Sequence, residues 1–93
     1  MNLSSQMDRE LLRKGTLRFL AERFRLALDV GQIVRLMEVR HYVDVDFDSQ
    51  DVEQALVVLE GEEFVKSITE QFGATVYYQI TGKGIVANER ING

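Results

Sequence analysis

Three aspartates at alternate positions are the residues of this chain whose spacing comes closest to a chemical site. Asp44, Asp46 and Asp48 have the D-x-D-x-D spacing that opens an EF-hand calcium loop, in which alternate carboxylates converge on one hard cation. The rest of that loop does not follow, because Ser49 stands where the turn glycine is needed and Ala55 where the bidentate glutamate is needed. We therefore interpret the aspartates as a solvated acidic turn that also caps the following helix.

Few other side chains offer catalytic chemistry. The chain has no cysteine and a single histidine, His41, so it can build neither a thiolate nucleophile nor a histidine-rich metal site, and we interpret His41 as a surface or packing residue. Gly82 and Gly84 fit neither the phosphate-binding loop nor the dinucleotide-binding pattern of glycines. The sequence therefore predicts a protein that is not an enzyme and that uses no cofactor, no metal and no small-molecule substrate.

Charge is divided unevenly along the chain. Residues 1–28 carry six basic and three acidic side chains, a local balance of +3. The twenty residues from Asp44 to Glu63 carry eight acidic side chains and no Lys or Arg, a local charge of −8 that is typical of a solvated face. The net charge of −4 argues against non-specific binding to nucleic acid or anionic lipid, because phosphate neutralisation needs clustered cations.

Hydrophobic periodicity predicts three helices in the first two thirds of the chain. The first runs from about Met7 to Leu28 and has two separate apolar stripes. These stripes are Leu17, Leu20, Phe24 and Leu28 on one side and Leu12, Phe19 and Leu26 on the other. A shorter apolar periodicity between Ile33 and Tyr42 predicts the second helix, and the third begins at the N-cap Asp48 and ends near Gly61.

The last third of the chain predicts a hairpin and a short helix. Phe64–Glu70 and Thr75–Ile80 are rich in β-branched and aromatic residues and flank the turn at 71–74. Thr81 is the expected N-cap of a last helix that ends at Asn92 and Gly93. The alternating segment 43–47 is interpreted as a connection.

The order of three helices, a hairpin and a helix predicts an α+β fold. At 93 residues we expect one domain over 1–93, with residues 1–6 disordered. The absence of proline and cysteine means that the fold must depend on packing and suits a reducing compartment. The polar N-terminus and the lack of an apolar run of roughly 20 residues predict a cytoplasmic protein with no membrane span.

This order of elements resembles the winged helix-turn-helix superfamily, in which the third helix is the recognition helix and the hairpin is the wing. Asp48 to Val65 is similar to the cap, helix and L-x-x-x-G-L-V exit of the recognition helix in MarR-like proteins. Tyr78 to Gly84, Y-Q-I-T-G-K-G, is similar to the Y-x-L-T-x-x-G end of their wing. Residues 11–20 and the chain length also resemble a family of small uncharacterised proteins from Mu-like prophages, which implies a phage-encoded accessory factor.

The exposed side of the predicted recognition helix is the main candidate site. The resemblance implies that its contact positions are Ser49, Gln50, Glu53, Gln54, Val57 and Glu60. The glutamine amides suit adenine, but Glu53 and Glu60 would repel phosphates, which supply much of the binding energy. We therefore predict that this acidic helix binds a basic protein surface, such as the first helix of a second copy, and that duplex DNA is the disfavoured partner.

Two adjacent valines on the same helix bear on this prediction. Val57 and Val58 cannot both share the core stripe of the helix, so at least one is expected to be exposed as an apolar contact rimmed by acids. The alternative is that Val58 packs under the wing.

Two further surfaces complete the predictions. A DNA-binding regulator that avoids its recognition helix would use cations of the first helix and the wing, namely Lys14, Arg18, Arg25 and Lys66. For Lys14, Arg18 and Arg25 the alternative is a solvated face that Glu22 partly neutralises, while Lys66 is opposed by Glu70. MarR-like proteins pair through terminal helices, which implies a homodimer interface formed by Leu12, Phe19, Leu26, Ile85 and Ile91. The alternative is that the first and last helices pack on each other within one chain.

Overall fold

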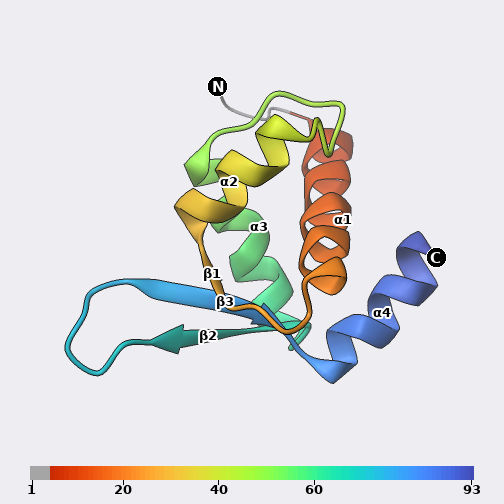
Figure 1. Cartoon of the computed structure of the whole chain (residues 1–93). Helices are drawn as coiled ribbons and strands as arrows, with labels where there is room; N and C mark the ends of the chain where they lie inside the picture. The colour runs from red at the N-terminus through yellow and green to blue at the C-terminus, as the bar shows by residue number, and fades with distance from the viewer. Residues whose placement is uncertain (1–4) are drawn as a thin grey trace.

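The computed structural model describes residues 5–93, and this part of the chain contains four helices and one antiparallel sheet (Figure 1). The elements in chain order are α1 (Gln6–Glu22), β1 (Leu28–Asp29), α2 (Val30–Val39), α3 (Ser49–Gly61), β2 (Val65–Thr69), β3 (Val76–Ile80) and α4 (Gly82–Asn92). The predicted α+β class and the order of helices and hairpin are confirmed. Figure 1 shows β2 and β3 extending away from the helices as a wing, with α4 on the other side of the molecule.

Each helix begins where a side chain accepts a hydrogen bond from the first turn. Ser5 accepts from the Asp8 N–H, and Thr81 accepts from the Gly84 N–H. Asp29 and Asp48 form reciprocal capping boxes, in which each cap also donates its backbone N–H to the side chain three residues later. Because such a cap contributes about 1 kcal/mol, these four residues fix where the helices start.

The first helix ends earlier than its periodicity predicts. α1 ends at Glu22 rather than near Leu28, because Leu28 and Asp29 form the short strand β1, which pairs with Tyr78 and Tyr77. The prediction of a helix to Leu28 is therefore wrong, and Leu26 lies outside any helix. Of the residues predicted to be disordered, residues 1–4 lie outside the described residues, while Ser5 caps α1 and residue 6 is its first residue.

The sheet has the order β1-β3-β2, with β3 in the centre. The hairpin register pairs Val65 with Ile80 at its base and Thr69 with Val76 near its tip. Val65 and Ile80 are buried against the helices, whereas Thr69 and most of the outer half of the wing are exposed. The base of the wing therefore belongs to the core, and its outer half projects into solvent.

Helix α1 lies at the centre of the packing and contacts α3, α4 and β3. Leu12 and Phe19, one of its two stripes, are 1% and 0% exposed, so both belong to the core. The prediction that these two side chains face a second copy does not fit this burial, because their own chain already covers them. Of the other residues predicted for a dimer, Leu26 and Ile91 are exposed and Ile85 is partly buried against the core.

Gly84, which follows the wing at the start of α4, has no space for a side chain. A Cβ there would lie 2.0 Å from the Phe64 carbonyl oxygen and 2.7 Å from Ile80 Cγ1. We expect Gly84→Ala to destabilise the protein by about 3 kcal/mol, the upper end of overpacking effects, in urea unfolding. Gly82→Ala is the matched control on the same helix, because nothing lies within 4 Å of its Cβ, and it should change stability by less than about 1 kcal/mol. Equal stability of the two variants would contradict this close contact.

Candidate nucleic-acid or protein interface around helix α3

One side of α3 is buried and the other is free for contacts. The buried side carries Val52, Ala55, Leu56 and Leu59. The six predicted contact residues are all exposed, namely Ser49, Gln50, Glu53, Gln54, Val57 and Glu60. Val57 and Val58 are 66% and 45% exposed, so both valines, and not only one, reach the surface.

Two acidic side chains of α3, those of Glu53 and Glu60, lie on the side that faces the sheet. The Ser67 hydroxyl of β2 donates a hydrogen bond to Glu60 at 2.7 Å. Burial raises the pKa of Tyr78 on β3, and the negative charges of Glu60 and Glu53 raise it further. We call Glu53 and Glu60 the acidic flank. Glu60 thus contacts β2, and the charge of Glu53 acts on Tyr78 of β3, so the acidic flank lies beside the wing.

The opposite side of α3 adjoins the N-terminal half of α1. Gln54 and Val58 line a groove of about 190 Å³ together with Arg9 and Arg13 of α1. Leu12, Asp51 and Ala55 complete its lining. We call this the α1–α3 groove. Both arginines are among the six basic residues of segment 1–28, and their spacing of four residues puts them on one face of a helix.

Lys14 and Arg18 remain on the exposed surface of α1. The Arg18 guanidinium lies 4.6 Å from the centre of the Tyr42 ring, and its Nε lies 3.4 Å from the Tyr42 hydroxyl. The same hydroxyl donates to Glu22, and burial together with this carboxylate raises the pKa of Tyr42 although Arg18 lowers it. Arg18 is therefore held in place by the loop after α2.

Arg25 and Lys66, the other two predicted cations, lie near the sheet. Arg25 is in the turn between α1 and β1, next to Phe24, whose carbonyl accepts a hydrogen bond from Gln79 Nε2 at 3.0 Å. Gln79 is the register partner of Lys66. The structure thus divides the four cations into a pair on α1 and a pair beside the wing.

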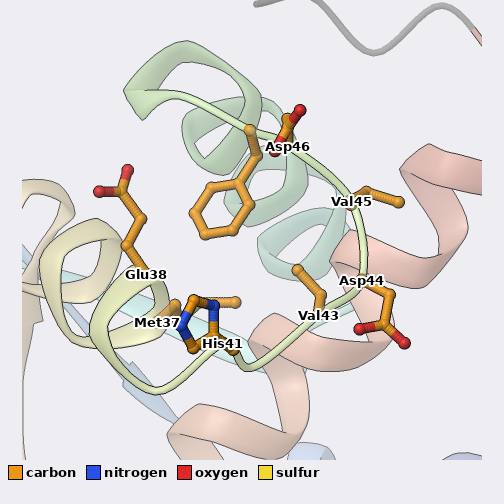
Figure 2. A pocket seen from close by; sticks show the side chains of 8 residues that line it. Met37, Glu38, His41, Val43, Asp44, Val45 and Asp46 are labelled. Carbon is orange, nitrogen blue, oxygen red and sulfur yellow. The ribbon is translucent and has the colours of Figure 1, made fainter.

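The acidic turn that resembles a calcium loop lines a pocket of about 490 Å³ with the end of α2. Figure 2 shows the carboxylates of Glu38, Asp44 and Asp46 pointing in different directions around this pocket. No group of three metal-ligating side chains occurs within residues 5–93. Val43 and Phe47 instead pack against the core. Asp48 acts as the cap of α3.

Comparison with known proteins finds structures with a similar fold but no relative by sequence. No family model matches the chain, and no curated protein matches it by sequence. A transcriptional regulator from Clostridium thermocellum, Cth-833, superposes with a TM-score of 0.75 at 20% identity, over 97% of this chain and 84% of that one. Two mutant forms of ZitR from Lactococcus lactis give TM-scores of 0.66 and 0.64 at 17% identity. The match covers 98% of this chain and 56% and 58% of theirs.

These similarities confirm the predicted fold. The chain has a winged helix-turn-helix fold, with α2 and α3 as the helix-turn-helix and the β2–β3 hairpin as the wing. In the described part of the chain, no helix combines the length and the apolar character that crossing a membrane requires. The phage context stays a prediction.

Tyr78 can report on the acidic flank. Because the charge of Glu60 helps to raise the pKa of Tyr78, we expect Glu60→Gln to lower that pKa toward its ordinary value near 10, measured by NMR titration of the tyrosine Cζ. Burial continues to hold it above that value. A raised pKa favours the folded state below pH 10, so the free energy of unfolding should fall as the pH rises through the Tyr78 pKa.

The control for this titration is Glu89→Gln, which removes an exposed carboxylate from α4. It should leave the Tyr78 pKa unchanged. An identical Tyr78 titration in the Glu60→Gln variant and the unmodified protein would show that the acidic flank does not act on the sheet.

Proposed function

We propose that this protein is a non-enzymatic transcriptional regulator that binds duplex DNA, with cations outside α3 contacting the phosphates. The proposal is supported by a fold shared over 97% of the chain with a protein described as a transcriptional regulator. The observation that carries it is the division of α3, whose acidic flank follows the wing while Gln50 and Gln54 stay exposed. Glutamine amides can pair with adenine in the major groove.

This proposal reverses the preference predicted from the sequence. Counting charge along the chain gave −8 for the segment around α3, and that count favoured a protein partner. Around the helix axis, however, the acids are not spread evenly. Glu60 is already bonded to Ser67, so part of the negative charge is directed at the wing rather than outward.

Two pairs of cations can supply the phosphate contacts that α3 lacks. Lys14 and Arg18 are exposed on α1, and Arg25 and Lys66 are exposed beside the wing. Contacts of this kind orient a protein on the duplex without reading sequence, and they make its affinity depend on salt. Base reading is then left to Gln50 and Gln54.

We expect the Lys14→Gln, Lys66→Gln double variant to bind duplex DNA more weakly and with less salt dependence. Each phosphate contact contributes roughly 0.9 to the slope of log K against log salt, so the slope should fall by up to about 1.8 in fluorescence anisotropy between 50 and 200 mM salt. Lys83→Gln is the matched control, because this third lysine is paired with Glu63 at 3.5 Å.

Two results would count against this proposal. The first is no binding of duplex DNA by the unmodified chain at low salt. The second is the same salt slope for the unmodified chain, the double variant and the Lys83→Gln control.

A second function, binding of a basic protein surface, is favoured by one specific observation. Val57 is 66% exposed on α3 and lies four residues after Glu53 and three before Glu60, which puts it on the same side of the helix. An apolar side chain rimmed by carboxylates suits a protein contact better than a phosphate. The basic side of α1 on a second copy has the complementary charge, which would make the protein self-associate.

Charge exchange tests this second function. One variant carries Glu53→Lys and Glu60→Lys, and the other carries Lys14→Glu and Arg18→Glu. We expect each variant alone to lose self-association, because its two contact surfaces then have charges of the same sign. Mixing the two variants should restore association, as measured by light scattering at low salt. Glu89→Lys on α4 is the control and should behave like the unmodified chain. A chain that is monomeric at every concentration and salt would exclude this form of the second function.

A further inference from the structure

We infer that the α1–α3 groove holds a phosphate group of the DNA backbone, bound by Arg9 and Arg13. This inference rests on the proposed DNA binding and adds to it a phosphate site that the predicted set of cations does not include. It concerns the side of α3 away from the wing, where Gln54 and Val58 line the groove and Asp51 is the one carboxylate in its lining.

The two arginines are arranged for one shared anion. They are one helical turn apart on α1, and both line the same groove of about 190 Å³. Arg13 is half-buried and Arg9 is exposed. The planar set of donors on a guanidinium matches a phosphate in two-point contacts, which a lysine cannot make.

One carboxylate also lines the groove. Asp51 is 7% exposed, and its side chain accepts the backbone N–H of Asp48 at 3.0 Å in the capping box of α3. Its charge is therefore directed toward the helix N-terminus, which stabilises it. The side chains that line the groove therefore carry two positive charges and one negative charge.

The α3 side of the groove connects the phosphate site to base recognition. Gln54 of α3 lines the same groove as the two arginines of α1. A phosphate bound between α1 and α3 would fix the position of α3 relative to the duplex, and Gln54 would then face a base edge near that phosphate. In this arrangement α1 supplies the cations that recognition helices usually carry themselves.

The test compares Arg9→Gln, Arg13→Gln with the matched control Arg40→Gln, Arg90→Gln, which removes two exposed arginines, one at the C-cap of α2 and one on α4. Glutamine keeps a polar side chain in the groove, and urea unfolding shows whether the variant is folded. For Arg9→Gln, Arg13→Gln we expect the slope of log K against log salt to fall by up to about 1.8 relative to the unmodified chain. The factor by which affinity is lost between 50 and 200 mM salt is then about twelvefold smaller than for the unmodified chain. Arg9→Lys, Arg13→Lys should recover most of the slope, since it restores the charges.

A second measurement separates this inference from the proposed function. Inorganic phosphate is titrated into the free protein, and the Nε–Hε signals of Arg9 and Arg13 are followed by NMR. Signal shifts without any binding of duplex DNA would support the phosphate site and contradict the proposed function. A different result would contradict the phosphate site but not the proposed function. In that case the unmodified chain binds DNA, the Arg9→Gln, Arg13→Gln variant has the same salt slope, and phosphate does not shift the arginine signals. If neither DNA nor phosphate is bound, both are wrong.

Discussion

Burial of both apolar stripes of α1 is the constraint on which the rest of this structure depends. A chain of 93 residues without cysteine has one small core, and α1 supplies its largest fully buried side chain, Phe19. The ring of Tyr42 packs edge-on to Phe19 with centroids 5.5 Å apart, and the Arg23 guanidinium lies 4.0 Å from the Phe19 ring centre. With these apolar side chains buried, Met7 and Leu11 are the large apolar residues that α1 still exposes, and the rest of its exposed surface is polar or charged.

The position of α1 also explains why the two sides of α3 differ. α3 packs against α1 on one side and against β2 on the other. The sheet offers hydroxyl groups, such as that of Ser67, which suit the carboxylate of Glu60. The α1 side offers guanidinium groups, beside which Gln54 and Val58 lie. The exposed face of α3 is thus bounded by two unlike neighbours, and each affects what the helix can contact.

The sequence was sufficient for features that depend on local chemistry. Asp48 and Thr81 were recognisable as caps because a short polar side chain precedes an apolar periodicity, and both cap the predicted helices. The wing followed from two β-rich runs around a turn. These signals act within a few residues, and distant parts of the chain do not alter them.

Features that depend on contacts across the chain were not predictable in this way. β1 has two residues and exists because Leu28 and Asp29 pair with β3, some fifty positions later in the chain. The apolar periodicity of α1 continues through these two residues, so the sequence pattern alone predicted a longer helix. The groove residue Arg13 gave only a weak signal, because nothing near it in sequence indicates that Gln54 stands opposite. Likewise, the sequence could not show that Leu12 was already covered.

The charge of the segment around α3 illustrates the same point quantitatively. At 0.1 M salt, charges more than about 10 Å apart on a surface are largely screened from each other, so eight acids in sequence do not act as one charge of −8. In the fold they have separate partners or directions. Asp48 and Asp51 cap the positive end of α3, Glu60 is bonded to Ser67, and Glu63 is paired with Lys83. What a phosphate would meet is therefore decided by the side chains on each side of α3, and on the α1 side those include two arginines.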